Sequence, residues 1–188
     1  MNKRNRLNID TPGGFWFFAY GALMWDPPFT PADTQSARLY GYHRSFCVNS
    51  ETYRGTPEKP GLSLGLDRGG SCTGVALYFD EASCDMAIRE IEAREMEDDP
   101  IYICRPVRLA LPDEPVRGYT LVVNREDRNF AGRPDFEETA RRIASCAGNR
   151  GPNIEYLANT VARLDAMQIP DGHLHHLLHR ATQLRGTS

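Results

Sequence analysis

The sequence has little of what marks secreted, membrane-spanning or nucleic-acid-binding proteins. Its five cysteines are scattered and form no CxxC pair, so neither a disulfide framework nor a zinc ribbon is expected. No apolar run approaches the length of a membrane span, and the charged first residues precede no apolar signal segment. Acidic residues outnumber basic ones by 25 to 22, without a long basic stripe. These absences predict a cytoplasmic protein with no membrane or nucleic-acid partner.

The length of 188 residues fits one ordinary domain with a single hydrophobic core. Residues 1–14 are polar and glycine-containing, so we expect them to form a mobile N-terminal tail. Residues 15–188 contain no internal repeat, no low-complexity segment and no linker that would divide them. A single domain over 15–188 is therefore expected.

Hydrophobic periodicity predicts strands in the first two thirds of this domain and mainly helices in the last third. Strands are expected at residues 15–20, 74–79, 107–111 and 119–123, and residues 37–49 are expected to form one or two strands. The glycine- and proline-rich residues 50–70 are expected to form a loop. The expected helices lie at residues 81–96, 134–146, 152–167 and 171–184. Because most strands precede the later helices, the pattern favours an α+β fold over a doubly wound sheet.

The first strand ends in a turn at Gly21, Ala22 and Leu23, where the sequence has no charge and no nucleophile. Successive backbone N–H groups in such a turn can form a small concavity that binds a carboxylate. The alternative is a tight turn that only prepares an aromatic anchor at Trp25. Both interpretations remain open from these residues alone.

One glutamate of the helix at 81–96 lies in line with its apolar stripe. Projected at 100° per residue, Cys84, Ile88, Ile91 and Glu95 fall within about 60° of one another. Glu95 is thus a candidate acid or base, although a residue at the rim of the core would show the same pattern. Glu92 lies only about 60° from Glu95, so geometry does not exclude it.

Other titratable residues favour structural interpretations. His175 and His179 share a helix face as metal ligands often do, but no third ligand can be named, and the neighbouring leucines form an amphipathic helix. We therefore expect no metal site. Cys47 and His43 lie four apart in an expected strand and so point to the same face, which predicts a core cysteine rather than a nucleophile.

Several stretches together resemble the ChaC-type γ-glutamylcyclotransferases, in the family's order and over nearly the whole domain. The stretches are YGALMW at residues 20–25, RGTPEKPG at 54–61, GVA at 74–76, REM at 94–96, and GPN at 151–153 followed by EYL at 155–157. The resemblance implies a small mixed β-barrel flanked by helices. It also implies a lyase-type activity without metal or organic cofactor, in which glutathione is cleaved by cyclisation into 5-oxoproline and cysteinylglycine.

The resemblance assigns the catalytic carboxylate to Glu95 and the substrate-binding loop to Tyr20, Gly21, Ala22 and Leu23. Ala22 stands where the family usually has serine, so a hydroxyl contact to the substrate is lost while backbone contacts can persist. Tyr156, in the EYL stretch, is counted among the substrate-binding residues.

Arg54 opens the RGTPEKPG loop, and its planar guanidinium suits the second carboxylate of glutathione. The alternative is an ordinary surface arginine in an exposed loop. Two alternative functions are a cyclotransferase for another γ-glutamyl amine or peptide, which Ala22 keeps open, and a non-catalytic γ-glutamyl-binding protein. The presence of Glu95 weighs against the last of these.

Overall fold

A computed structural model describes residues 7–96 and 101–186. Within it the chain forms two compact units. The first unit comprises Met1–Arg44 and Gly65–Asp127, and the second comprises Ser45–Leu64 and Arg128–Ser188.

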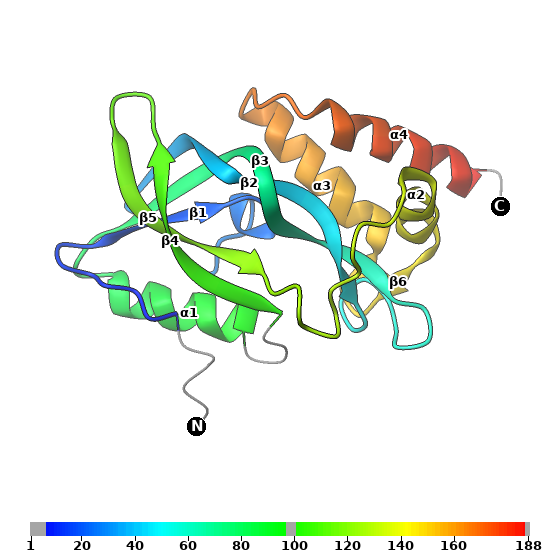
Figure 1. The fold of residues 1–188 in the computed structure, drawn as a ribbon, viewed down its shortest axis with the longest axis horizontal. Helices are drawn as coiled ribbons and strands as arrows, with labels where there is room; N and C mark the ends of the chain where they lie inside the picture. The colour runs from blue at the N-terminus through cyan, green and yellow to red at the C-terminus, as the bar shows by residue number, and fades with distance from the viewer. Residues whose placement is uncertain (1–6, 97–100, 187–188) are drawn as a thin grey trace. The chain divides into compact units, whose positions relative to one another are not determined.

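Five strands build a closed barrel in the order β1-β3-β2-β4-β5 (Figure 1). Strand β1 pairs antiparallel with β3 and parallel with β5, while β4 pairs antiparallel with β2 and β5. The strands are β1 (Phe15–Ala19), β2 (Asp33–Ser50), β3 (Gly61–Phe79), β4 (Tyr102–Ala110) and β5 (Pro115–Val123). The mixed pairing confirms the predicted mixed barrel.

The core of the first unit is made by apolar residues of these strands. Successive side chains of a strand point to opposite faces, and consecutive residues of β1 and β5 are buried, so both faces of these strands are covered over part of their length. Phe17 of β1, Leu77 of β3 and Leu109 of β4 are almost fully buried, at 1%, 3% and 0% exposure. Each such side chain contributes about 1.5–3 kcal/mol through burial.

Strand β3 begins earlier than predicted. The sequence predicts a loop over residues 50–70, whereas β3 starts at Gly61 and runs to Phe79. The side chains of Leu62, Leu64 and Leu66 are 0%, 2% and 0% exposed, which is the alternation of a buried strand. A Cβ at residue 61 would overlap the Arg54 carbonyl, so this close approach of two backbone segments requires glycine. The glycine that suggested a loop therefore has a packing role in the strand.

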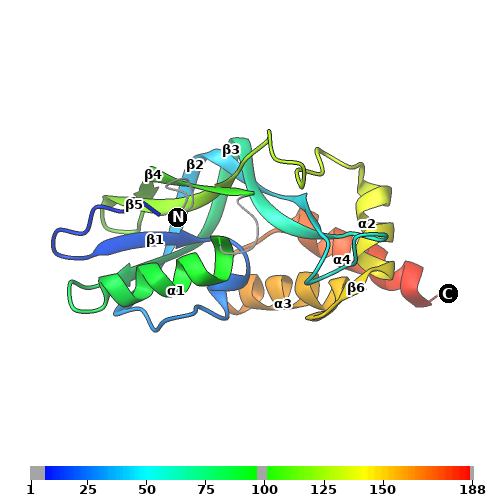
Figure 2. The same cartoon turned by 90° about the horizontal axis from the view of Figure 1, so that it is seen from below.

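The four predicted helices are present, each shifted by only a few residues at its ends. They are α1 (Cys84–Met96), α2 (Phe136–Ser145), α3 (Asn153–Ala166) and α4 (Gly172–Gly186). Helix α1 belongs to the first unit and lies on one side of the barrel (Figure 2). Helices α2, α3 and α4 pack against one another in the second unit (Figure 1), which also holds the short hairpin of β6 (Ala147–Gly148) and β7 (Gly151–Pro152).

Local signals explain where α1 and α2 begin. Asp135 caps α2 by accepting the Glu138 N–H at 2.8 Å. At the start of α1, the Asp80 carboxylate accepts the Ser83 N–H at 2.9 Å. The bond to Glu138 satisfies an N–H that has no partner within the helix, whereas Ser83 directly precedes α1 and its N–H also donates to the Asp80 carbonyl at 3.1 Å. Among the described residues, no helix has the length and apolar character needed to cross a membrane.

The N-terminal segment differs from the predicted mobile tail in its second half. Residues 1–6 lie outside the described residues, but Leu7 is fully buried and its N–H donates to Glu92 Oε1 at 2.6 Å. The Asp10 N–H donates to the Tyr119 hydroxyl at 3.0 Å. The buried side chain of Leu7 and these two hydrogen bonds anchor the segment to the first unit.

Candidate active site

The loop after β1 forms one turn of 3-10 helix, η2 (Ala22–Met24). The Gly21 carbonyl accepts the Met24 N–H at 2.9 Å, and the Ala22 carbonyl accepts the Asp26 N–H at 3.0 Å. The N–H donors of these bonds belong to Met24 and later residues. The N–H groups of Ala22 and Leu23 lie before the first donor of the turn, where a helical turn has no internal acceptor for them. The N-cap residue is Gly21, which has no side chain that could cap the turn. Backbone N–H groups at the start of a turn are the kind of donor that can bind a carboxylate.

Arg44 of β2 holds the first residue of this loop. Its Nε donates to the Tyr20 carbonyl at 2.6 Å, and its Nη2 donates to the Thr73 carbonyl of β3 at 2.9 Å. One guanidinium therefore fixes the end of β1 against the neighbouring strand. Sequence reasoning missed Arg44, because its bond to Tyr20 joins residues 24 positions apart.

Glu95 lies near the end of α1, at the edge of the buried face of the helix. Cys84, Ala87 and Ile91 form that face, at 5%, 0% and 1% exposure. The Glu95 side chain is 21% exposed, so it is largely shielded yet still reaches solvent. Ile88, which belongs to the predicted stripe, is only half-buried, and Ala87 is buried in addition to Cys84 and Ile91. Glu95 lies at the edge of this buried face.

Arg94 connects Glu95 to the loop after β1. Its Nε lies 3.3 Å from Glu95 Oε1, and its Nη1 lies 3.1 Å from Asp26 Oδ2. Nη1 also donates to the Asp26 carbonyl. The loop and Glu95, both predicted for the site, are thereby brought together within the first unit. Sequence reasoning missed Arg94 and Asp26, although Arg94 stands directly beside the predicted glutamate.

Glu92, the alternative carboxylate, has a structural partner. Its Oε1 accepts the Leu7 N–H and so anchors the N-terminal segment. No comparable link from Glu92 to the Ala22 turn is present among the bonds described for residues 7–96. The geometry therefore favours Glu95 over Glu92 as the candidate acid or base.

Arg54 and Tyr156, the two remaining predicted site residues, meet in the second unit. The Arg54 guanidinium carbon lies 5.5 Å from the centre of the Tyr156 ring. Arg54 Nη1 donates to the carbonyls of Arg150 and Pro152, at 2.6 and 3.2 Å. Burial lowers the pKa of the Arg54 guanidinium, and the neighbouring Tyr156 and Glu155 partly offset this effect. The cation therefore already supports the β6–β7 hairpin.

Hydrogen bonds join the RGTPEKPG and GPNIEYL stretches within the second unit, directly or through adjacent residues. Asn153 is fully buried, and its side chain both accepts the Leu62 N–H at 2.6 Å and donates to the Leu62 carbonyl at 2.8 Å. Arg142 of α2 donates to the Pro60 carbonyl at 2.9 Å and to Asn49 Oδ1 at 2.6 Å. These motifs therefore have a structural explanation in addition to any contact with substrate.

The histidines of α4 bond to different partners. His175 Nε2 lies 2.8 Å from Asp165 Oδ1, and its Nδ1 lies 2.7 Å from the Asp171 carbonyl. These contacts raise the pKa of His175, with the backbone bond as the larger cause. His179 Nε2 instead contacts Gln183 Nε2 at 2.9 Å. The two rings are thus engaged separately.

The five cysteines, all within the described ranges, are present as thiols. Cys47 is fully buried, which confirms the prediction of a core residue. His43 Nδ1 lies 3.0 Å from the Gly69 carbonyl. Burial raises the pKa of Cys104 to about 11, so this thiol stays protonated at neutral pH.

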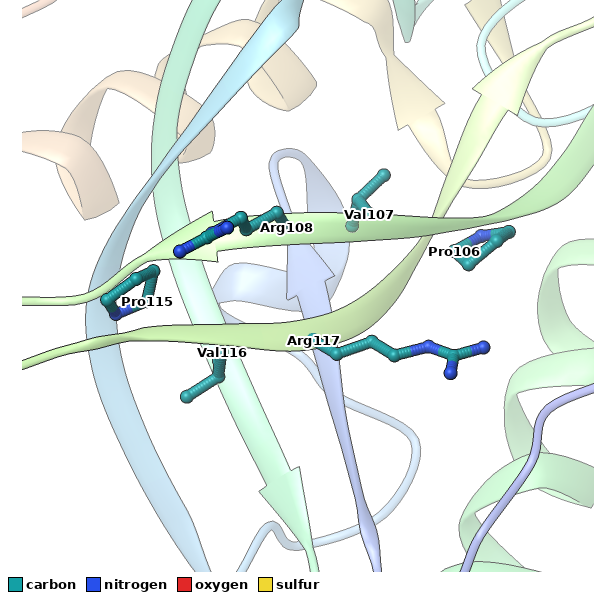
Figure 3. Close-up of a pocket in the computed structure, with 6 residues that line it drawn as sticks. All are labelled: Pro106, Val107, Arg108, Pro115, Val116 and Arg117. Carbon is teal, nitrogen blue, oxygen red and sulfur yellow. The ribbon is translucent and has the colours of Figure 1, made fainter.

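A hollow of about 540 Å³ opens on the outside of the β4–β5 hairpin (Figure 3). Arg108 and Arg117 face each other in the strand register, but their side chains point in opposite directions. This divergence relieves the repulsion between like charges on paired strands. The hollow is lined by Pro106, Val107, Arg108, Pro115, Val116 and Arg117, and so belongs to the hairpin rather than to the loop after β1.

Comparison with known proteins identifies relatives over most of the chain. The chain is 30% identical to the glutathione-specific gamma-glutamylcyclotransferase of Escherichia coli (strain K12) over 167 residues, which cover 88% of this chain and 72% of the relative. It is 29% identical to glutathione-specific gamma-glutamylcyclotransferase 1 of Homo sapiens over 174 residues, or 89% of this chain and 78% of the relative.

The fold matches that of a solved structure. A gamma-glutamyl cyclotransferase specific to glutathione from yeast superposes with a TM-score of 0.86 at 21% identity, covering 94% of this chain and 99% of that chain. This likeness confirms the α+β barrel with flanking helices. The family described as ChaC-like protein matches residues 15–184. The chain therefore belongs to the ChaC-like family, as its motifs predict.

Proposed function

We propose that this protein is a γ-glutamylcyclotransferase that cleaves glutathione into 5-oxoproline and cysteinylglycine. The observation that carries the proposal is the connection of Glu95, through Arg94, to the turn at Ala22. Relatives whose names specify glutathione support the choice of substrate. The five thiols fit a reducing compartment, so we also propose the cytoplasm as its location.

The reaction needs no nucleophile from the protein. The α-amine of the γ-glutamyl group attacks its own γ-carbonyl carbon and closes a five-membered ring. The bond from this carbon to the cysteine nitrogen then breaks, and that nitrogen gains a proton. Because both reacting groups belong to one molecule, holding them in a folded geometry can contribute on the order of 7–11 kcal/mol. Positioning is thus the main task of the site.

Proton transfer is the task proposed for Glu95. The substrate ammonium must lose a proton before it attacks, and the leaving amine must gain one, so one carboxyl group can serve both steps. The support for this role is geometric. The Glu95 side chain is 21% exposed, so it is largely enclosed by protein and still accessible to a substrate.

The turn at Tyr20 to Leu23 is proposed to bind the α-carboxylate of the γ-glutamyl group. Backbone N–H groups at the start of a helical turn attract an anion without any charged side chain. Ala22 provides a backbone N–H but no hydroxyl. The charge-free sequence of this loop is therefore compatible with an anionic substrate.

Arg54 and Tyr156 are proposed to contribute mainly through the shape of the second unit. Arg54 Nη1 is already occupied by two backbone carbonyls, and the ring of Tyr156 packs beside the guanidinium. A direct contact between Arg54 and the second carboxylate of glutathione is the alternative, and turnover of substrates that lack this carboxylate separates the two roles.

The decisive experiment is to incubate purified protein with glutathione and identify the products by mass spectrometry. Stoichiometric 5-oxoproline and cysteinylglycine are expected. A parallel incubation with γ-glutamyl dipeptides that lack the terminal glycine measures substrate range. Release of free glutamate instead of 5-oxoproline would indicate hydrolysis and contradict the cyclisation. Binding of glutathione without turnover would indicate a non-catalytic protein.

A further inference from the structure

Arg94 is the side chain that joins two parts of the proposed active site. It lies between Glu95 on α1 and Asp26 in the segment that follows η2. Its side chain is 15% exposed, so its contacts form in a partly desolvated place. Charge-assisted bonds of this kind are stronger than those of a fully exposed ion pair.

The contact between Arg94 and Glu95 is unusual for adjacent residues of a helix. Successive side chains point about 100° apart, so neighbours at i and i+1 do not normally face each other. Here Nε and Oε1 nevertheless lie 3.3 Å apart, which requires both side chains to bend toward each other. A carboxylate held in this way has fewer orientations than one on an exposed helix surface.

The other end of Arg94 reaches the backbone of the loop. Nη1 donates to the Asp26 carbonyl, and the Asp26 N–H donates to the Ala22 carbonyl at 3.0 Å. A continuous path of polar contacts therefore runs from Glu95 through Arg94 and Asp26 to Ala22. The exposed Asp26 carboxylate adds an ion pair, but the backbone contact is the part that defines the position of the loop.

We propose that Arg94 is a positioning residue that fixes the distance between the Glu95 carboxylate and the carboxylate-binding turn at Ala22. This inference rests on the proposed function, because the two ends must hold the amine and the α-carboxylate of the same γ-glutamyl group. In such a reaction a misplacement of about 1 Å can cost about a hundredfold in rate. A guanidinium suits the role because its planar nitrogens can bond to several acceptors at once.

The test compares Arg94→Met, Arg94→Lys and wild type in steady-state glutathione turnover, with thermal unfolding measured on each protein. Arg94→Met should lower kcat by at least about tenfold while KM changes by less than about threefold, since substrate binding at the turn persists. Arg94→Lys should recover part of kcat, because it keeps the charge but not the fork. Arg89→Gln, an exposed arginine of the same helix, is the matched control and should behave like wild type.

The outcomes separate this inference from the proposed function. A wild-type protein that forms no 5-oxoproline would remove both. An active wild type whose Arg94→Met variant keeps kcat within about twofold would overturn the positioning role alone. So would a loss that is equal in Arg94→Lys and Arg94→Met and that follows only the folded fraction, because this would indicate a contribution to stability without positioning.

Discussion

Glu95 shares helix α1 with carboxylates that provide internal comparisons. Glu90 is exposed on the same helix, whereas Glu92 anchors the N-terminal segment through Leu7. Glu95→Gln keeps the shape of the side chain but removes proton transfer, so kcat should fall by at least about a hundredfold. Initial rates of 5-oxoproline formation measure this loss.

Glu90→Gln is the control for that experiment and should leave kcat unchanged. Substrate binding to Glu95→Gln, measured by calorimetry with glutathione, should persist, because the Ala22 turn is untouched. If Glu92→Gln abolished turnover while Glu95→Gln did not, the assignment of the acid and base would move to Glu92.

Ala22 permits a gain-of-contact experiment. It is the first residue of η2 and is only partly buried, so a serine hydroxyl there can face the proposed carboxylate site. One added hydrogen bond contributes about 0.5–1.5 kcal/mol, which predicts that Ala22→Ser lowers KM by about twofold to tenfold with little change in kcat. Steady-state kinetics with glutathione measures the effect, and the exposed Ala82→Ser is the control. An unchanged KM would show that a hydroxyl at residue 22 makes no contact with substrate.

The β6–β7 hairpin depends on Arg54. Replacing Arg54 by alanine leaves the carbonyls of Arg150 and Pro152 without their donor and removes the cation from the Tyr156 ring. Bonds from charged donors contribute about 1.5–3 kcal/mol, so the free energy of unfolding should fall by a similar amount. Urea denaturation followed by circular dichroism measures this loss.

Substrate comparison separates the two roles of Arg54. If the guanidinium only supports the hairpin, Arg54→Ala lowers turnover of glutathione and of γ-glutamyl substrates without a second carboxylate to the same extent. This is the result that we expect from its backbone contacts. A loss restricted to glutathione, with unchanged stability, would instead establish a direct contact between Arg54 and the glycine carboxylate.

The regular elements were largely predictable, because their signals are local. A short aromatic run predicted β1 and period-two hydrophobicity predicted the end of β5, while an aspartate precedes the start of both α1 and α2. The first residues of β3 were not predicted as strand, because the alternating leucines after Gly61 stand among glycines and charged residues that are typical of a loop. The composition there indicated a loop while the spacing of the leucines indicated a strand, and the segment is a strand with these leucines buried.

The arginines that organise the site were not predictable in the same way. Arg94 bonds to a residue 68 positions away, and Arg44 bonds to one 24 positions away. No spacing rule for helices or strands covers such separations, because the fold sets these partners and local sequence does not. Glu95 became a candidate by two local routes, its place beside the apolar stripe of its own helix and the REM stretch that resembles the family's motif.

The two compact units carry different parts of the motif set. The first unit holds the Ala22 turn, Arg44, Arg94 and Glu95, and thus every group to which the proposed chemistry assigns a proton or the α-carboxylate. The second unit holds the RGTPEKPG and GPNIEYL stretches, whose side chains largely bond to its own backbone. Motifs that identify a family can therefore maintain its fold as well as its chemistry.

The proposed reaction also predicts how the whole protein responds to chelation. Ring closure by the substrate's own amine needs a base and an acid but no Lewis acid, and Glu95 can supply both proton transfers. The histidines of α4 bond to separate partners, with His175 on Asp165 and His179 on Gln183. Exhaustive dialysis against EDTA should therefore leave both kcat for glutathione and the thermal unfolding midpoint unchanged. A loss of turnover that added zinc restores would show that a metal takes part, and a lower unfolding midpoint alone would place that metal in the fold rather than in the reaction.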